Sequence, residues 1–422
     1  MSSAGSTPRP IRIDPQAGTV AVIDQRRLSD LPVLHSNPML LMQLSPAAVS
    51  VATNMSFLDT RSGDNARLTE FSIAGTPAST HEITLDGASN TTTSGGTSAR
   101  QRTIAFVPPS DIVDEFRIET AAFDAAAGAT PAGLVTINLK SGTNDYHGAA
   151  RFFKTNPGWN ANDFFSNRYG RPRSAIKNSH WVLSGSGPVL IPKLYDGRNR
   201  TFFVYGYERQ RDDAPWAGGV YSVPTESQRR GDFSGLLGLG PQYQIYDPAT
   251  ATLSGGRVNR RPFAGNIVPA SRFSPVARKI LDYYPAPRSA GIADGTQNYP
   301  FPDLQLNSTI WSHTGRIDHN FTARHRMFVR AYYGDKRQTY RDYFENLATG
   351  LDGPFLNRGA TMDHVYTLRP NLILNARYSF TRFLHKWIPK SQGMDLKVLG
   401  FPDSLASQVD RVTSSFPQIS IS

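Results

Sequence analysis

The feature that most constrains the fold is a series of long segments in which apolar and polar residues alternate, running from residue 146 to residue 386. Alternation with a period of two places one set of side chains on each face of a β-strand. The last segment is the clearest, because Leu372, Leu374 and Phe380 share one face while Asn375 and Arg377 share the other. The pattern predicts antiparallel strands at residues 146–153, 179–187, 201–210, 309–320, 326–336, 359–368 and 372–386.

Short and long connections alternate between these predicted strands. The turns near Ala323 and Asn371 are short, and the turn at 193–199 is moderate. The remaining connections are long and polar, at residues 154–178, 211–308 and 337–358. Short turns at one end of the strands and long loops at the other are typical of outer-membrane β-barrels. A soluble sandwich would also explain the alternation, but compact domains seldom hold unstructured connections of this length. We therefore expect an incomplete transmembrane β-barrel.

The chain before residue 146 differs from this pattern, because its apolar runs are short and separated by turn residues. Residues 71–75 and 82–87 alternate as strands, and Asp86-Gly87 is a strong turn signal. We expect the Asp86 carboxylate to accept hydrogen bonds from nearby backbone N–H groups rather than to act in catalysis. A strand of branched residues follows at 134–140 and ends in the turn cluster Ser141–Asp145.

Two short helices are predicted in the same region. The first spans residues 38–44 and is expected to dock through Met39, Leu40 and Leu44. The second spans residues 111–116, with Ser110 as its N-cap. Together with the short strands, these helices predict a small α+β domain.

Composition limits the possible classes of function. The mean hydropathy is −0.38, and no run reaches the roughly 18 apolar residues that a membrane-spanning helix needs. Barrel strands alternate and keep hydropathy low, so this value is compatible with a membrane barrel. The absence of cysteine excludes disulfides and thiolate metal sites. The net charge of +11 is spread along the chain without a dense basic stripe, so we expect no nucleic-acid partner.

No catalytic, cofactor or metal site is predicted. The chain contains no P-loop, dinucleotide-binding fingerprint or HExxH motif. No pair of carboxylates indicates a glycosidase. His313, His319 and His325 lie close in sequence but are not spaced as metal ligands, and we expect them to be solvated or to lie in an aromatic girdle. We therefore expect a protein that is not an enzyme.

Several motifs occur in a fixed order. Around the turn cluster these are Asp114-Glu115-Phe116, Ser141-Gly142-Thr143-Asn144 and His147-Gly148. The long 211–308 connection carries Arg230-Gly231-Asp232-Phe233-Ser234, Ile245-Tyr246-Asp247-Pro248-Ala249-Thr250 and a run from Pro262 to Ala277 that leads to Tyr283-Tyr284-Pro285. From about Thr19 to the end, the sequence resembles TonB-dependent outer-membrane transporters, most closely the Oar-like branch.

The resemblance implies a domain organisation and a function. Residues 1–18 would be a disordered segment, 19–145 a plug domain, and 146–422 part of a β-barrel whose long extracellular loop is 211–308. The family's barrel has about 22 strands. The TonB complex of the inner membrane would drive uptake or export of a bulky ligand through this barrel in the outer-membrane lipid. Nothing in the sequence identifies the ligand.

The polar faces of the predicted strands supply the candidate site residues. Arg316, Arg330 and Arg377 lie on these faces, and in a barrel they would face the lumen. They would either bind an anionic ligand or hold the plug by hydrogen bonds, and the second role is favoured. The first residues resemble no signal peptide, so an outer-membrane location implies that the segment was lost by truncation. The alternative function is that of a surface or secreted β-rich protein that binds a carbohydrate or another ligand.

Overall fold

A computed structural model of the chain describes residues 20–24, 27, 37–50, 71–78, 80–93, 102–120, 133–168, 170, 173, 175–340 and 342–419. The expected disordered segment 1–18 lies outside these residues. The chain divides into two compact units. The described residues up to Ala214, Asn307–Arg337 and Pro354–Lys386 form the first unit, and Pro215–Leu306, Gln338–Gly353 and the described residues from Trp387 onward form the second. No helix among the described residues is long and apolar enough to span a membrane.

A small mixed sheet forms the N-terminal domain of the first unit. Its strand order is β1-β8-β9-β4-β5, with β4 and β9 parallel and the other pairs antiparallel. The strands are β1 (Val20–Asp24), β4 (Glu82–Leu85), β5 (Ala88–Ser89), β8 (Val113–Glu119) and β9 (Leu134–Leu139). Two further pairs are β2 (Ala48–Ser50) with β3 (Phe71–Ile73) and β6 (Thr91–Thr93) with β7 (Arg102–Ile104).

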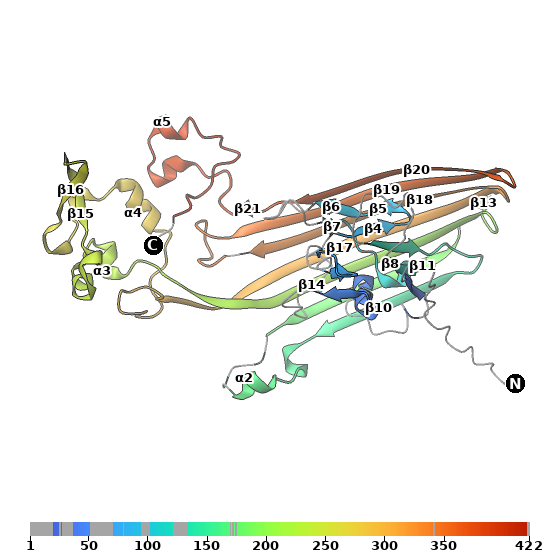
Figure 1. Cartoon of the computed structure of the whole chain (residues 1–422), viewed down its shortest axis with the longest axis horizontal. Helices are drawn as coiled ribbons and strands as arrows, with labels where there is room; N and C mark the ends of the chain where they lie inside the picture. The colour runs from blue at the N-terminus through green and yellow to red at the C-terminus, as the bar shows by residue number, and fades with distance from the viewer. Residues whose placement is uncertain are drawn as a thin grey trace. The chain divides into compact units, whose positions relative to one another are not determined.

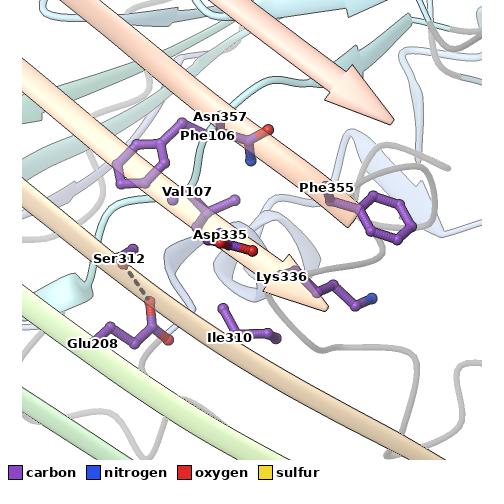
Figure 2. Close-up of a pocket in the computed structure, with 10 residues that line it drawn as sticks. Phe106, Val107, Glu208, Ile310, Ser312, Asp335, Lys336, Phe355 and Asn357 are labelled. Atoms are coloured by element: carbon purple, nitrogen blue, oxygen red, sulfur yellow. Dashed lines mark hydrogen bonds between the residues drawn. The ribbon is translucent and has the colours of Figure 1, made fainter. Parts of the chain in front are cut away.

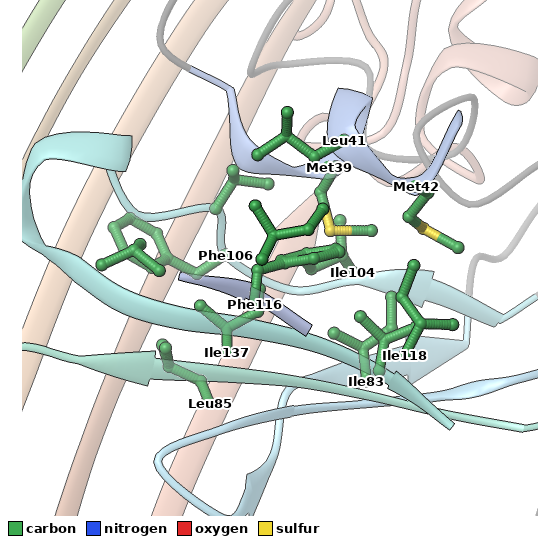
Figure 3. Close-up of a cluster of buried hydrophobic side chains, with 14 of the residues drawn as sticks. Met39, Leu41, Met42, Ile83, Leu85, Ile104, Phe106, Phe116, Ile118 and Ile137 are labelled. Atoms are coloured by element: carbon green, nitrogen blue, oxygen red, sulfur yellow. The ribbon is translucent and has the colours of Figure 1, made fainter. Parts of the chain in front are cut away.

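Alternating residues of these strands build one apolar core (Figure 3). In β9 every second side chain is buried, from Val135 through Ile137 to Leu139. Phe116 and Ile118 of β8 pack in the same cluster. Burial of several large apolar side chains, each contributing about 1.5–3 kcal/mol, stabilises a domain whose individual strands are short.

The two predicted helices differ from the structure in detail. The first is the 3-10 helix η2 (Pro38–Leu44), in which Met39 and Met42 are buried, whereas Leu44 is 52% exposed rather than docked. A 3-10 helix has three residues per turn, so positions three apart lie on one side. The second predicted helix, at residues 111–116, is wrong. Only the single 3-10 turn η4 (Ser110–Ile112) forms there, and strand β8 begins at Val113. Ser110 lies inside this turn and does not cap it.

Seven long antiparallel strands follow, each paired with its neighbour in sequence (Figure 1). They are β10 (His147–Thr155), β11 (Lys177–Pro188), β14 (Thr201–Tyr221), β17 (Tyr299–Thr322), β18 (His325–Tyr340), β19 (Leu351–Arg369) and β20 (Leu372–His385). The short strand β21 (Ile388–Pro389) also pairs with β19. All seven predicted strands are present, and most extend further than the alternation indicated.

The connections keep the expected alternation of length. Two residues separate β17 from β18 and β19 from β20, and the turn between β11 and β14 holds only the hairpin of β12 (Leu190–Ile191) and β13 (Tyr195–Asp196). Because β14 and β17 are longer than predicted, the connection between them is 222–298 rather than 211–308, and that between β18 and β19 is 341–350. The connection between β10 and β11 carries η6 (Pro157–Trp159) and α2 (Phe164–Arg168).

The apolar faces of the long strands do not pack under a second sheet in the described part of the chain. In β20, Leu372, Leu374 and Phe380 are 49%, 51% and 53% exposed. Arg377, on the opposite face, donates a hydrogen bond from Nε to Asp363. This is the arrangement of a sheet that is apolar outside and polar inside.

The second unit is built mainly from the long connection between β14 and β17. It contains α3 (Glu226–Arg229), η7 (Ser234–Leu239), η8 (Pro241–Tyr243), β15 (Tyr246–Ser254), β16 (Arg257–Pro262), η9 (Ala264–Asn266), η10 (Ala270–Arg272), α4 (Pro275–Leu281), η11 (Leu396–Leu399) and α5 (Asp403–Ala406). Ile280 of α4 packs with Leu399 and Phe416 in a small core. Asn266 is fully buried, and its side chain bonds to backbone groups of three residues in two segments, at position 233 and at positions 243 and 245.

Candidate functional site

The turn that joins β4 to β5 is the centre of a polar site between the N-terminal domain and the long strands. Asp86 and Gly87 both have positive φ, at 49° and 73°, the backbone of a tight hairpin turn. Asp86 is nearly buried, and its Oδ1 accepts a hydrogen bond from the backbone N–H of Leu139 at 2.9 Å. Leu139 lies 53 residues away on β9, so Asp86 does not act as the local turn cap that its position predicted.

Two arginines from neighbouring strands bind this carboxylate. Arg316 of β17 reaches Asp86 Oδ1 from Nη1 at 2.9 Å, and Arg330 of β18 reaches Oδ2 from Nη1 at 3.1 Å. Arg330 also donates to the carbonyl of Leu85 at 2.6 Å and to Thr361 Oγ1 at 2.7 Å. With only 2% of Arg330 exposed, this is a buried, charge-assisted contact.

The third arginine approaches the same turn from another strand. Arg377 of β20 donates from Nη1 to the carbonyl of Gly87 at 2.7 Å and from Nε to Asp363 Oδ2 at 2.6 Å. Arg316 is likewise paired with Asp318, Nη2 to Oδ1 at 2.7 Å. The three arginines predicted from the sequence are therefore brought together on the Asp86–Gly87 turn.

The charges of this cluster balance. Three guanidinium groups face the carboxylates of Asp86, Asp318 and Asp363. The aromatic ring of Phe328 lies 4.2 Å from the centre of the Arg316 guanidinium and shields it from water. Because the charges are paired and hydrogen-bonded, the cluster can be largely excluded from solvent without the cost of an isolated buried ion.

A second set of polar contacts links η4 to the first long strand, β10. Arg151 of β10 pairs with Asp111, Nη2 to Oδ1 at 2.6 Å, and Lys140 donates to the Asp111 carbonyl at 2.6 Å. Burial raises the pKa of the Asp111 carboxyl, against the opposing attraction of Arg151 and Lys140. The sequence analysis did not single out Arg151, although it lies on a strand adjoining the turn cluster.

Apolar contacts accompany these polar ties. The rings of Phe106 and Tyr332 stack with their centroids 4.2 Å apart and their planes 12° apart. Gly206 of β14 leaves room for Ile112, because a Cβ at this glycine would lie 2.9 Å from Ile112 Cδ1. A Cβ at Gly359 would meet the Tyr332 ring at 2.3 Å. These close approaches could not be predicted from the sequence, because they join segments far apart in the chain.

A small cavity lies beside the Phe106 contact (Figure 2). Its volume is about 20 Å³, enough for one water-sized occupant. Phe106 and Val107 line one side, and Glu208, Ser312 and Asp335 of three long strands are among the residues that line the rest. The cavity has no room for an organic ligand.

A buried polar network covers the same face of β11 and β14. His180 Nε2 lies 2.7 Å from Glu208 Oε1, and Gln210 donates to both oxygens of Asp212. These side chains are almost fully buried. A polar inner face of this kind contrasts with the exposed Leu372 and Phe380 of the outer face, as barrel strands require.

The three histidines each contact a hydroxyl or imidazole group of another long strand. His313 Nδ1 contacts Tyr205 Oη at 2.5 Å, His319 Nδ1 contacts Thr201 Oγ1 at 2.6 Å, and His325 contacts His364. Among the described residues, no group of three or more His, Asp or Glu side chains could hold a metal ion. His313 also packs against Trp311 and Tyr207, so it belongs to an aromatic cluster.

The long strands form one antiparallel sheet whose polar face contacts a small mixed domain. Residues 138–422 match the model of the outer membrane beta barrel domain family. The chain belongs to this family and is a protein of the outer membrane. Comparison with curated proteins finds no match.

Solved structures of transporters and receptors align with the chain at low sequence identity, and the first described below shares its fold. The outer membrane transporter YddB from Escherichia coli aligns with a TM-score of 0.53 and 11% identity over 88% of this chain and 40% of YddB. A ferric enterobactin receptor (PfeA) mutant from Pseudomonas aeruginosa aligns with a TM-score of 0.48 and 11% identity, over 87% of this chain and 41% of PfeA. The ferric-catecholate import receptor Fiu from E. coli K12 aligns at 0.41 and 10%, over 88% of this chain and 50% of Fiu. The chain thus spans half or less of these proteins.

Proposed function

We propose that the chain belongs to an Oar-like, TonB-dependent outer-membrane transporter that moves a bulky ligand across the membrane. In this proposal residues 19–145 form the plug and residues 146–422 contribute barrel strands, with 211–308 on the extracellular side. The observation that carries the proposal is the Asp86–Gly87 turn, which arginines of three different strands hold. A fold shared with the transporter YddB supports it.

The chemistry of these contacts suits a plug that must be held and also moved. A hydrogen bond between two protein groups is exchanged for hydrogen bonds to water when it breaks, so even a bond to a charged group contributes a net of only about 1.5–3 kcal/mol. A wall contact made of such bonds can open as water enters the lumen. A large apolar interface would instead expose its surface at about 25 cal/mol per Å². Energy delivered by the TonB complex from the proton gradient would then suffice to shift the plug.

The lumen-facing arginines hold the plug in this proposal rather than binding the ligand. Arg316, Arg330 and Arg377 each donate to a group of the turn or the strand before it, and each also donates to a side chain of the long strands. Donors already engaged in this way would have to leave the plug before binding an anionic ligand. When the plug moves and these hydrogen bonds break, the arginines become available to bind an anionic ligand.

The test uses a cysteine introduced into the plug as a reporter of its movement, because the 422 residues of this sequence contain none. Ile112 is 1% exposed and packs against Gly206 of β14. In cells that produce the complete protein, Ile112→Cys should react with a membrane-impermeant maleimide faster when TonB and the proton gradient are present. Equal reaction rates after deletion of TonB or addition of a protonophore would contradict the proposal.

A disulfide lock provides the second arm. A Cβ at Gly206 would lie 3.3 Å from Ile112 Cγ2 and 3.5 Å from Cγ1, so cysteines at these two positions are within disulfide reach. Oxidised Ile112→Cys/Gly206→Cys should lose energy-dependent uptake, and a reductant should restore it. The matched control joins two wall strands through Ala149→Cys/Ser184→Cys, which face each other across β10 and β11. This pair should leave uptake unchanged.

A further inference from the structure

The hairpin of β15 and β16 stands out in the second unit because almost all of its residues are exposed. Every residue of β16, from Arg257 to Pro262, is exposed. The tip is the pair Gly255-Gly256, both at positive φ, with open space around each α-carbon. A two-residue turn of this kind matches the twist of the two strands and sets their register next to the tip. The two strands therefore pair in a fixed register next to the tip, although few other residues pack against them.

The tip of this hairpin carries an apolar pair. Leu253 and Val258 face each other across the two strands, and they are 77% and 58% exposed. Side chains directly opposite each other in a hairpin lie on the same face of the ribbon. Leu253 and Val258 thus form one small apolar surface next to the turn. Isolated apolar residues are normal on a protein surface, so this pair indicates a binding surface only together with the residues around it.

The neighbours of this apolar pair are basic. Arg257, Arg260 and Arg261 lie on β16, and their guanidinium groups have no hydrogen bond or ion pair within the part of the chain that the structure describes. The acidic residue of the hairpin, Asp247, is already bound by Arg272 at 2.6 and 2.9 Å. Three unneutralised positive charges therefore lie close to one apolar pair along the strand. By strand alternation Arg260 is on the same face as Val258, and Arg257 and Arg261 are on the opposite face.

We propose that this hairpin, residues 246–262, docks on an anionic lipid surface, with Leu253 and Val258 inserted between headgroups and the three arginines on their phosphates. An apolar tip with flanking basic residues suits the boundary between charged headgroups and acyl chains. Basic residues gain affinity near an anionic membrane surface, by about fivefold each. A soluble polyanion would use the arginines but leave the apolar pair exposed to water. The inference does not depend on plug movement or on TonB.

The experiment measures binding of the intact protein, held in nanodiscs of phosphatidylcholine, to added vesicles. Wild-type protein should float with vesicles that contain about 30% phosphatidylglycerol and not with vesicles of phosphatidylcholine alone, and high salt should release it. The variant Arg257→Gln/Arg260→Gln/Arg261→Gln should need about a hundredfold more anionic lipid. Leu253→Ser/Val258→Ser should need about tenfold more. The matched control is Arg230→Gln, because Arg230 is an exposed arginine of the same unit with only a loose contact to Glu226 at 3.8 Å.

A second readout reports the tip directly. Ser254→Cys labelled with an environment-sensitive dye should increase in fluorescence with anionic vesicles and not with soluble heparin. Equal flotation of the triple-arginine variant and wild type would overturn the proposal. An effect of the arginines without any effect of Leu253→Ser/Val258→Ser, together with full competition by heparin, would also overturn it and assign the hairpin to a soluble polyanion. Equal binding to anionic and neutral vesicles would be a third contrary result.

Discussion

Replacing Asp86 should loosen the N-terminal sheet more than any other single change in the arginine cluster. Asp86→Ala removes the carboxylate that pairs with both Arg316 and Arg330 and that accepts from the Leu139 N–H. Arg316 keeps Asp318 as a counter-ion, but Arg330 keeps only the neutral oxygens of Leu85 and Thr361 as hydrogen-bond acceptors among the described residues. The change leaves a buried cation without a carboxylate among the described residues.

The magnitude follows from that unpaired charge. Removing one member of a buried ion pair costs about 3–5 kcal/mol. Since each 1.4 kcal/mol is a factor of ten, opening of the sheet should become about 10²- to 10⁴-fold more frequent. Asp86→Asn keeps a side-chain oxygen for Leu139 and a residue that tolerates positive φ. It should therefore cost less, about 1.5–3 kcal/mol for the loss of the charged partner.

Hydrogen exchange of backbone amides is the suitable assay, because it reports local opening without unfolding the barrel. Amides of β4 and β9 in Asp86→Ala should exchange at least a hundredfold faster than in the wild type. Asp196→Asn is the matched control, because Asp196 pairs with Arg198 in an exposed turn and its loss should not change these amides. Adding Arg330→Met to Asp86→Ala should restore part of the protection, since it removes the unpaired cation. A change of less than tenfold in Asp86→Ala would refute the reasoning.

Three further predictions concern other contacts. Gly359→Ala should lower stability by about 1–3 kcal/mol, because its Cβ would meet the Tyr332 ring at 2.3 Å, and heat-modifiable gel mobility should report a lower transition temperature than in wild type. Burial raises the pKa of the Asp111 carboxyl, so the folded state binds the Asp111 proton more tightly than the unfolded state does. The stability that this proton contributes is complete below the ordinary pKa of 3.8 and is lost as the pH rises through the pKa of the folded state. The unfolding free energy of Asp111→Asn, which has no such proton, should therefore fall less between pH 4 and pH 7 than that of wild type. Asn266→Ala removes side-chain bonds to residues 233, 243 and 245, each contributing about 0.5–1.5 kcal/mol, so limited proteolysis should cut the 222–298 connection faster, whereas cutting at an unchanged rate would show that the amide is dispensable.

Strand alternation in the sequence was sufficient to predict the barrel, because it is a local property of each strand. The pattern at Leu372, Leu374 and Phe380 required no knowledge of any partner strand. It failed at the strand ends, where β14 continues through residues 211–221 despite a proline and two glycines. Pairing with neighbouring strands overrides weak local preference there. The same reason explains the error at residues 111–116, where the chain forms strand β8 instead of a short helix.

Partners in the candidate site could be predicted only in part. Alternation placed Arg316, Arg330 and Arg377 on the polar faces of their strands, but it could not give the residue that they bind. Arg330 and Asp86 are separated by 244 positions in the chain. A short-range interpretation of Asp86-Gly87 therefore favoured a local cap, and only the packing of β4 beside β9 and the long strands turns the carboxylate toward the arginines.

The location of the charges also separates two kinds of interaction that the sequence could not distinguish. Arg316 and Arg330 are matched by carboxylates and mostly buried, so they stabilise one arrangement of the chain and contribute little to attraction at a distance. Arg257, Arg260 and Arg261 are exposed, and the acid of their hairpin is already paired with Arg272. Such charges act through the field that they project into solvent. High salt should therefore weaken anything that binds the hairpin while leaving the Asp86 cluster nearly unchanged, because a Debye length of about 8–10 Å screens exposed charges far more than buried pairs.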